Sequence, residues 1–380
     1  MSMSVLRKNI AKGIERLLWG VAAGRCEFRG CNRALYIHDI TGVIKNLAEK
    51  AHIHAVKPLG ARYIEQEKKD NIENLMLVCK ACHDIIDGAP ELYTAEYLYK
   101  MKIEHEKRIQ ILTAIGAEMK SHLIYYTANI ADNRLAVDDG DAKKAITSIG
   151  RYPAEMRSID ISVYGSYIED RDETYYLESV TNLQKAIKNQ ITDIIEHGKS
   201  VALFAIAPQP LLVFLGHQLN DKYNISVFQC HRRDNDKWSW YDEPNSVNFQ
   251  NVFPHKTNSE GEIALVLAMS SSVPTERITS VIGKTAIIYV TTLDRPNRIF
   301  VTHPSIMDEF VEKSREILEK IKQTHGNSKT VHVFPVMPVS LAVRFGMDYM
   351  SKTDNPLIIY DEIAGKGFIP AIKIGDQHDK

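Results

Sequence analysis

Hydrophobic positions follow two different patterns in the two parts of this chain. In residues 4–23 apolar side chains recur every three or four positions with Lys and Arg between them, which predicts an amphipathic helix that ends near Gly24. A second helix is expected over residues 94–115, after Pro90. Residues 25–88 hold only short apolar runs, as expected of a domain whose core is too small to fold unaided.

The second half alternates continuous apolar segments with amphipathic stretches. The apolar segments are SVALFAIAP, EIALVLAMSSSV, KTAIIYVTT, KTVHVFPVMP and NPLIIYD, and helical patterns cover 180–196, 209–221 and 305–324. This alternation predicts α/β layers with largely parallel sheets, whose ligands bind beyond the C-terminal strand ends. Residues 199–219 and 329–346 share a strand, a Pro-containing turn and a helix that ends in Gly, which suggests paired halves.

A polar stretch rich in Asp and Gly separates the two patterns. We therefore expect a first domain over residues 1–115, a linker over 116–155 and a second domain over 156–380. No run of about 18 apolar residues predicts a membrane span, and the charged N-terminus lacks the apolar core of a secretory signal. These features predict a cytoplasmic protein without a membrane partner.

Charge differs between the two parts, although the whole chain carries a net charge of only −1. Residues 1–110 contain 18 Lys and Arg against 14 Asp and Glu (+4), and the remainder contains 29 against 34 (−5). A mildly basic first domain suits a polyanionic partner, but solvated surface charge explains +4 equally well.

Four of the five cysteines form two closely spaced pairs in the first domain. Cys26 and Cys31 are separated by four residues, and Cys79 and Cys82 by two, which is typical of a structural zinc site with four thiolate ligands. In the cytoplasm such clusters favour a metal over disulfides. Cys230 stands alone and is interpreted as a core or surface thiol.

The cysteine frame encloses His52 in AHI, Asn74 in NLMLVC, and His83 directly after the second pair. Over residues 20–110 this arrangement resembles the HNH endonucleases, whose ββα-metal domain is α+β and zinc-stabilised in the form expected here. The resemblance implies that His52 is the general base, that Asn74 holds its loop, and that His83 binds a catalytic Mg²⁺ or Mn²⁺ ion. From the residues alone, Asn74 could instead cap a turn, and His54 could replace His52 as the base.

The chain departs from the HNH pattern at the position before the base. Many HNH enzymes carry a metal-binding Asp or His there, whereas this chain has Ala51. Glu49 lies on the same face of the strand and could reach the ion, or could be a solvated surface carboxylate. His38, Asp39 and Asp87 are further candidates. Nearby basic side chains could contact phosphates with little sequence specificity: Lys57, Arg62, Lys68, Lys69 and Lys80.

The segments SVYGSYIEDRD, FAIAPQPLLVFLGHQL and VHVFPVMPVSLAVRFG, with NPLIIYD, resemble the HNH–SAVED effectors of bacterial cyclic-oligonucleotide antiphage systems (CBASS). The resemblance implies an α/β SAVED domain of two fused CARF-like Rossmann units that binds a cyclic di- or oligonucleotide. It also implies a bacterial protein that is a dimer at rest and a larger assembly such as a tetramer when activated. The active form would cut double-stranded DNA largely without sequence preference.

Candidate ligand-binding residues follow the strand ends of the second half. Hydroxyl and amide groups there could hold phosphates. The two tryptophans could stack on a purine or lie in the core, and Arg344 could pair with a phosphate or only cap its helix. The candidates are Pro208, Gln209, Trp238, Trp240, Ser270, Ser271, Ser272 and Arg344.

Three functions are therefore open. The first is the ligand-gated endonuclease. The second is a modification-dependent HNH restriction endonuclease in which Trp238 and Trp240 hold a flipped base, although the acidic second half argues against DNA binding there. The third is a non-enzymatic zinc-binding module fused to a sensor.

Overall fold

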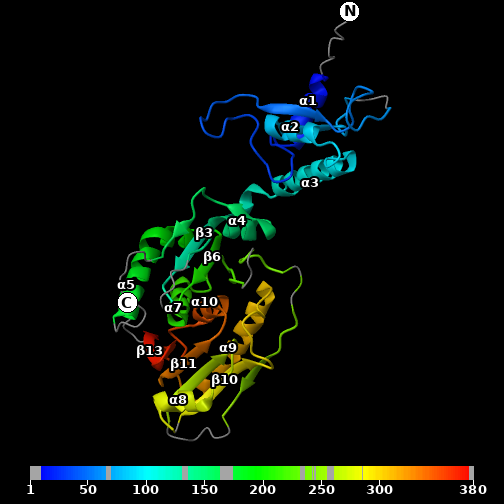
Figure 1. Cartoon of the computed structure of the whole chain (residues 1–380). Helices are drawn as coiled ribbons and strands as arrows, with labels where there is room; N and C mark the ends of the chain where they lie inside the picture. Colours follow the sequence, from blue (N-terminus) through cyan, green and yellow to red (C-terminus); the bar gives the residue numbers. More distant parts are fainter. Residues whose placement is uncertain are drawn as a thin grey trace, which may run out of the picture. The chain divides into compact units, whose positions relative to one another are not determined.

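The computed structural model divides the chain into two compact units, Met1–Gly116 and Ala117–Lys380 (Figure 1). Each unit has its own hydrophobic core. The structure describes residues 10–65, 70–130, 136–162, 174–231, 236–241, 243, 245–254, 261–284 and 286–375.

A short antiparallel hairpin followed directly by a helix forms the centre of the N-terminal unit. Strand β1 (Ala48–His52) pairs with β2 (Leu75–Cys79), and α2 (Lys80–Gly88) continues from the end of β2. All five β2 residues are buried, because both α1 (Lys12–Val21) and α2 pack against this strand. Helix α3 (Ala95–Thr113) contacts α1. The unit therefore has a ββα order with two supporting helices at the positions expected from the hydrophobic pattern.

The first sheet of the C-terminal unit has the strand order β4-β3-β6-β7, with β5 also paired to β3. All of its pairings are parallel. The strands are β3 (Lys120–Thr127), β4 (Tyr152–Pro153), β5 (Ile159–Asp160), β6 (Val201–Ile206) and β7 (Ile225–Val227).

The expected linker over residues 116–155 is therefore wrong. Strand β3 lies beside β6 in the sheet, and seven of its eight residues are buried. The residues after β3 are mostly polar, and their composition led to the assignment of the whole stretch, including this core strand, to a linker. The second unit begins at Ala117.

The second sheet has the order β13-β12-β11-β9-β10-β8, with a parallel centre and antiparallel strands at both edges. Its strands are β8 (Phe249–Val252), β9 (Ile263–Ala268), β10 (Ile287–Leu293), β11 (Val331–Val336), β12 (Leu357–Ile363) and β13 (Gly367–Ile374). The helices of this unit are η1 (Ala117–Met119), α4 (Asp139–Ser148), α5 (Tyr175–Ala186), η2 (Ile187–Ile191), α6 (Thr192–Glu196), α7 (Gln209–Leu219), α8 (Thr275–Ile282), α9 (Pro304–His325) and α10 (Val339–Asp348). Parallel strands alternating with helices confirm the α/β prediction for this unit.

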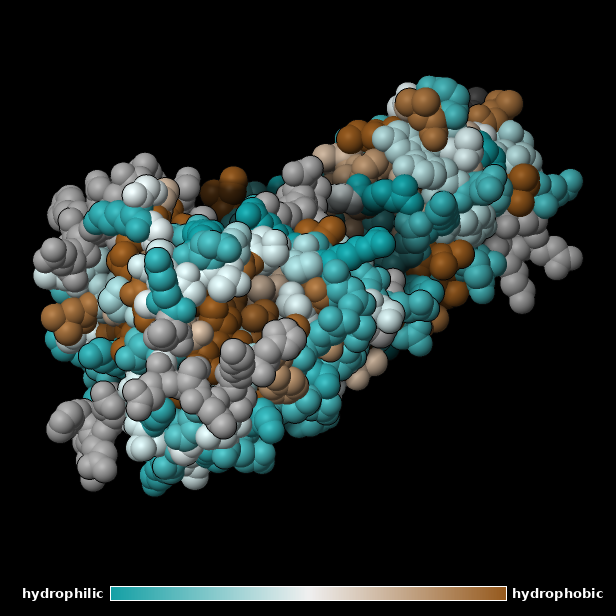
Figure 2. Space-filling model, turned by 90° about the horizontal axis from the view of Figure 1, so that it is seen from below, coloured by the Kyte–Doolittle hydropathy of each residue, from teal (hydrophilic) through white to brown (hydrophobic). Residues whose placement is uncertain are grey.

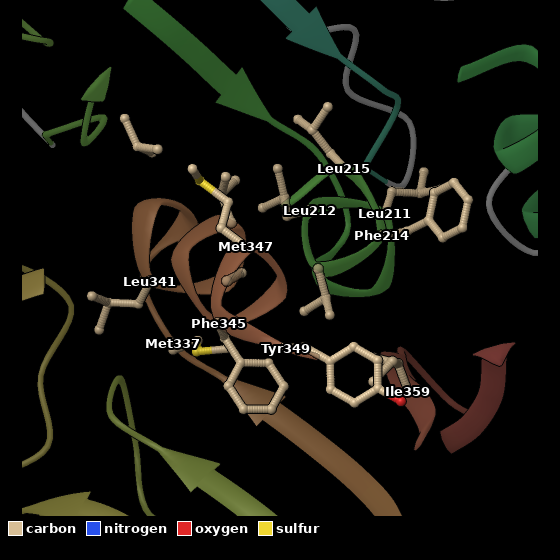
Figure 3. Packing of buried hydrophobic residues seen from close by; sticks show 14 of the residues in the cluster. Leu211, Leu212, Phe214, Leu215, Met337, Leu341, Phe345, Met347, Tyr349 and Ile359 are labelled. Carbon is tan, nitrogen blue, oxygen red and sulfur yellow. The ribbon is translucent and has the colours of Figure 1, made fainter. Parts of the chain in front are cut away.

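The two sheets repeat one strand–turn–helix unit. Strand β6 and the start of helix α7 correspond to β11 and the start of α10 with a shift of 130 residues, as from Val201 to Val331. Helices α7 and α10 pack directly against each other, with apolar side chains of both helices filling the space around their contact (Figure 3). The paired halves suggested by the sequence are therefore present in the fold.

Glycines permit the close approach of α7 and α10. A Cβ atom added at Gly216 would overlap the carbonyl oxygen of Val343, and one added at Gly346 would overlap that of Val213. Each helix thus places a glycine against the backbone of the other, which no residue with a side chain allows.

Apolar side chains also reach the surface, where Figure 2 shows brown groups set among teal polar side chains. Strongly exposed examples are Ile40, Ile44 and Leu59 in the first unit, and Met156 and Leu177 in the second. Exposed apolar side chains are common on folded proteins, and no function is assigned to these.

Candidate functional site

The four paired cysteines converge in the N-terminal unit. Their Sγ atoms all lie within 4.8 Å of one another. Cys26 and Cys31 come from the segment after α1, Cys79 ends β2, and Cys82 lies in the first turn of α2. The Cys31 and Cys79 sulfurs are 3.9 Å apart, close to the separation of about 3.8 Å that four sulfurs at about 2.3 Å from one tetrahedral ion would have. The cluster could therefore hold a zinc ion.

The chemistry of the thiols agrees with a cation site. All four are free cysteines. Burial raises the pKa of Cys26 to about 12 and raises that of Cys82 even further. Burial also acts to raise the pKa of Cys79, but hydrogen bonds that the Cys82 backbone and neighbouring thiols donate to its sulfur lower that pKa overall. A bound divalent ion would make thiolates the favoured form at all four positions.

Asn74 fixes the backbone of the turn after β1. Its side chain is buried; its Oδ1 accepts a hydrogen bond from the His54 amide at 2.8 Å, and its Nδ2 donates to the His54 carbonyl at 3.0 Å. Its own carbonyl accepts from the Ile53 amide at 2.9 Å. One buried amide therefore holds the backbone of His54, in the turn directly after His52.

His52 and His54 have different partners. The Nε2 atom of His52 lies 2.8 Å from Asp70 Oδ1, so a neutral ring that donates to Asp70 keeps Nδ1 as a proton acceptor. His54 Nδ1 lies 2.7 Å from the Arg62 carbonyl oxygen and must donate to it. His52 thus has the carboxylate partner that suits a general base. Asp70 was not among the residues singled out from the sequence.

His83 projects from α2 beside Asp87, one helical turn further along. Its Nδ1 atom is 3.4 Å from Asp87 Oδ2, and the two side chains are 24% and 60% exposed. An imidazole and a carboxylate on one accessible helix face could together meet a divalent ion. Asp87, a minor candidate in the sequence, is the carboxylate that the structure places next to His83.

Glu49 does not join these residues. It is exposed, and among the described residues only the four cysteines form a cluster of three or more potential metal ligands. Ala51, on the same strand face, is buried in the core of the unit. The expectation that Glu49 reaches the catalytic ion is therefore not supported by its position.

Other candidates of this unit also have local partners. His38 bonds to Thr41, and Asp39 pairs with Arg33. Arg62 is only 8% exposed, so its guanidinium is not available to a phosphate, which corrects that expectation. Lys57 and Lys80 are exposed, whereas Lys68 and Lys69 lie outside the described residues.

The C-terminal unit has two topological switch points, where adjacent parallel strands continue in opposite directions. In the first sheet, β3 leads to β4 on one side and β6 leads to β7 on the other. In the second sheet, β9 leads to β10 and β11 leads to β12 in the same manner. Ligands of open α/β sheets bind at the carboxyl ends of such strands. The N-termini of α7 and α10, which favour anions, begin at these edges.

Side chains connect the two switch points. Gln209, at the start of α7, donates from Nε2 to the Met337 carbonyl oxygen at 2.9 Å. In the reverse direction, Gln229 Oε1 accepts from the Ser340 amide and hydroxyl at the start of α10. The strand ends of the two halves therefore form one continuous edge within this unit.

The sequence candidates divide into two groups at this edge. Pro208 and Gln209 precede and begin α7, and Ser270 follows β9 with its amide bonded to the Val336 carbonyl oxygen at 2.8 Å. Ser271 and Ser272 are exposed immediately after it. These five residues lie at the two switch points.

The remaining three candidates are engaged elsewhere. Trp238 is 2% exposed and packs edge-on against Phe204, so it cannot stack on a ligand, and that expectation is wrong. Trp240 stacks on Phe228 at a ring separation of 5.9 Å. Arg344 pairs with Asp308 at 2.8 Å instead of pointing freely from α10. The segment SVYGSYIEDRD lies outside the described residues from 163 onward.

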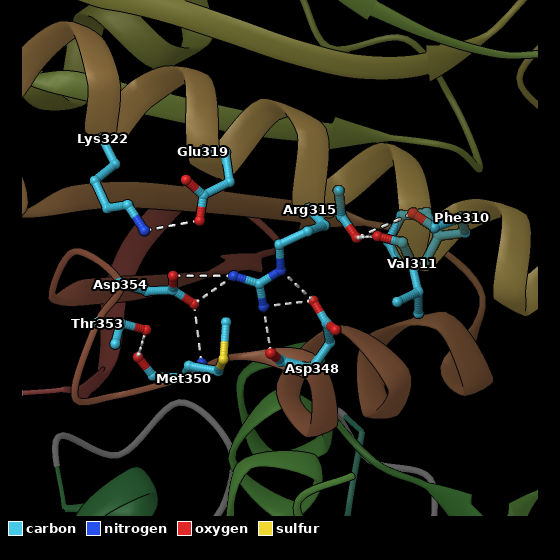
Figure 4. A network of polar contacts seen from close by, with 10 residues as sticks. Phe310, Val311, Arg315, Glu319, Lys322, Asp348, Met350, Thr353 and Asp354 are labelled. Carbon is cyan, nitrogen blue, oxygen red and sulfur yellow. Dashed lines mark hydrogen bonds and ion pairs between the residues drawn. The ribbon is translucent and has the colours of Figure 1, made fainter.

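A polar network holds the end of α10, as Figure 4 shows. Arg315 on α9 donates from Nη1 to both carboxylate oxygens of Asp354 at 2.9 and 2.8 Å, and from Nε to Asp348 at 3.0 Å. Burial raises the pKa of Asp348, and the charge of Arg315 opposes that rise. This network anchors the helix whose start lies at the strand-end edge.

Fold and site together define a two-unit protein, with a cysteine-framed ββα unit and an α/β unit of two Rossmann-like halves. A model of the SAVED family, described as "SMODS-associated and fused to various effectors sensor domain", matches residues 183–374. The chain therefore belongs to the SAVED family, and this part of the sequence-based expectation is confirmed. No curated protein gives a match.

Several solved structures are similar to this chain at low identity. The Acinetobacter baumannii Cap4 SAVED/CARF-domain receptor with the cyclic trinucleotide 2′3′3′-cAAA has a TM-score of 0.44 and 12% identity, covering 77% of this chain and 60% of that one. The same receptor with 3′3′3′-cAAA has a TM-score of 0.41 and 8% identity, covering 77% of this chain and 62% of that one. The Moraxella osloensis Cap4 SAVED/CARF-domain receptor has a TM-score of 0.37 and 9% identity, covering 77% of this chain and 59% of that one. The chain thus spans about three fifths of the length of these receptors. Among the described residues, no helix is long and apolar enough to cross a membrane.

Proposed function

We propose that this chain is a metal-dependent endonuclease that a cyclic oligonucleotide switches on, and that it acts as an antiphage effector. The N-terminal unit cuts double-stranded DNA with little sequence preference, and the SAVED unit senses the activator. The observation that carries the proposal is His52 at the end of β1, paired with Asp70 and followed by the Asn74-clamped turn, in the same ββα unit as His83.

A structural zinc ion on the four cysteines supports this arrangement. The thiols connect the segment after α1 to the junction of β2 and α2. Asn74 and His83 flank that junction in the chain. A bound zinc therefore stabilises the short elements from which the proposed catalytic residues project.

In the proposed mechanism, His52 takes a proton from the attacking water at Nδ1, the nitrogen that its bond to Asp70 leaves available. Asp70 then stabilises the imidazolium that forms. His83, with Asp87 next to it, would hold a divalent ion, Mg²⁺ or Mn²⁺. When bound, such an ion would stabilise the charge that develops on the phosphate and the leaving oxygen.

The activator is proposed to bind along the strand-end edge of the SAVED unit. This edge offers the N-termini of α7 and α10 and the exposed hydroxyls of Ser271 and Ser272, all suited to phosphate groups. Membership of the SAVED family supports a cyclic di- or oligonucleotide as the ligand.

Gating requires that the activator bind the active assembly more tightly than the resting one. We propose a dimer at rest and a larger assembly, such as a tetramer, in the active state. A difference of about 10⁴-fold in affinity converts a mostly inactive population into a mostly active one. Size-exclusion chromatography with multi-angle light scattering, with and without activator, measures that shift.

The deciding experiment incubates the protein and Mg²⁺ with plasmid DNA, with and without a panel of cyclic di- and trinucleotides. Cutting that appears only with one ligand supports the proposal. Equal cutting with and without ligand contradicts gating, and absence of cutting under all conditions contradicts the nuclease function. In the last case, an analysis that finds one zinc and no Mn²⁺ binding favours the non-enzymatic zinc-binding module.

The positions of the two tryptophans do not support the alternative function, a modification-dependent restriction endonuclease. That function needed Trp238 and Trp240 to hold a flipped base, but Trp238 is buried and Trp240 stacks on Phe228. A shift of the isolated second unit by DNA in a gel would restore it.

A further inference from the structure

Arg62 lies between β1 and β2 in an unfavourable environment. Its side chain is only 8% exposed although a guanidinium stays charged, and its φ of 59° falls in the left-handed region. Both features cost free energy in a residue with a side chain. Compensating contacts must therefore hold Arg62 in place.

These contacts join three segments of the N-terminal unit. The Nε atom of Arg62 donates to the Ile53 carbonyl oxygen at 2.9 Å. Its Nη1 atom donates to the carbonyl oxygens of Tyr93 at 3.1 Å and Ile86 at 3.4 Å. Ile53 lies in the Asn74-clamped turn, and Ile86 lies on α2 about one turn after His83.

Arg62 also contacts the polar groups around the two histidine-bearing segments. Its carbonyl oxygen accepts from His54 Nδ1 at 2.7 Å. Its Nη2 atom is 3.7 Å from Asp87 Oδ1, and the other oxygen of that carboxylate is 3.4 Å from His83 Nδ1. One buried side chain thus meets the turn that follows His52 and the carboxylate beside His83.

We propose that Arg62 is a positioning residue that fixes the spacing between the turn after His52 and the metal-binding face of α2, and that directs Asp87 toward His83. This inference rests on the proposed nuclease function. Arginine suits the task because its planar fork donates to several fixed carbonyl oxygens at once, whereas a lysine ammonium is a point charge on a flexible stem. Groups that orient metal ligands usually change metal affinity or activity by about 10- to 100-fold.

The test compares the full-length wild-type protein with Arg62→Lys, which keeps the charge and removes the fork. We expect unchanged zinc content, Mn²⁺ affinity lowered about 10- to 100-fold, and kcat for DNA cleavage lowered by a similar factor with KM unchanged. Mn²⁺ affinity is measured by electron paramagnetic resonance titration. The matched control is Arg33→Lys, an exposed arginine of the same unit that pairs with Asp39, and it should behave as wild type.

A second variant, Asp87→Asn, separates positioning from general destabilisation. It removes the carboxylate that Arg62 directs and should weaken Mn²⁺ binding without lowering the melting temperature of the N-terminal unit. Wild-type Mn²⁺ affinity and kcat in Arg62→Lys would overturn the inference. So would losses that occur only together with loss of zinc and a lowered melting temperature.

Failure of the proposed function gives a different result. If no cyclic nucleotide induces DNA cleavage by the wild-type protein, the nuclease proposal fails. The Mn²⁺ titration still decides the role of Arg62, because it does not depend on cleavage. Arg62-dependent Mn²⁺ binding in an inactive protein supports the positioning role alone.

Discussion

The two units of this protein are stabilised in different ways. The largest fully buried aromatic side chains all lie in the sensor unit, including Trp238, Phe204 and Phe345. The core of the N-terminal unit contains no buried aromatic residue among its described members, and three of the four clustered cysteines are part of it. A large apolar core can sustain a fold alone, whereas a small one usually needs a metal or a cross-link. The comparison indicates that the N-terminal unit can unfold while the sensor unit remains folded.

Removing the metal site should produce the largest difference in stability between the two units. Cys79→Ser, or a strong chelator, should unfold the N-terminal unit because zinc binding to such sites contributes on the order of 10 kcal/mol to folding. The sensor unit should keep its thermal transition and its response to the activator. Calorimetry together with zinc analysis measures both effects. Cys230→Ser is the control, and a single transition lost throughout the chain would contradict the separation of the units.

Removing the proposed base should separate the units by function. His52→Ala should lower activator-induced DNA cleavage about 10²- to 10⁴-fold because it removes general base catalysis. The activator should still raise the melting temperature of the sensor unit by mass action. His54→Ala is the comparison variant. If it abolishes cleavage and His52→Ala does not, the roles of the two histidines are reversed.

A substitution at the crossing of α7 and α10 should damage the sensor unit. Gly216→Ala places a methyl group against the Val343 carbonyl oxygen and should cost about 3 kcal/mol through overpacking. Denaturant unfolding monitored in each unit measures the cost. Gly20→Ala, a helical glycine in the N-terminal unit with open space around it, should cost nothing or stabilise slightly. Equal effects of the two variants would show that the close crossing is not maintained.

The smallest expected effect is a pH dependence of the N-terminal unit at His105. Burial lowers the pKa of His105 below its usual 6.5, and Arg108 also lowers it, while a bond to the Ala22 carbonyl oxygen opposes the shift. A folded-state pKa below the unfolded value means that this stability is present above about pH 6.5 and is lost as the pH falls through the folded pKa. His105→Asn should make the melting temperature fall less steeply as the pH is lowered from 7.5 to 5. Identical pH profiles for both proteins would contradict the assignment.

Sequence patterns predicted the features that depend on local spacing. The cysteine pairs, the order of His52, Asn74 and His83, and the alternating apolar runs of the second half are all local motifs whose elements appear in the fold at the expected places. Pro208 and the Ser270–Ser272 run were found because strand ends are readable from apolar segments that stop abruptly.

Features that depend on distant partners were not predictable in this way. Asp70 and Arg62 gain their roles from contacts across the segment between β1 and β2, which the sequence does not position. The sequence left Trp238 open between stacking on a ligand and lying in the core, and the fold places its ring in the core beside Phe204. Strand β3 was assigned to a linker because the polar residues after it dominated the composition of that stretch.

The reciprocal glycines of α7 and α10 have a mechanical consequence. Because main chain meets main chain on both sides of the crossing, no intervening side chain can change rotamer to absorb a displacement. A displacement of either helix at this crossing therefore requires the other helix to move with it.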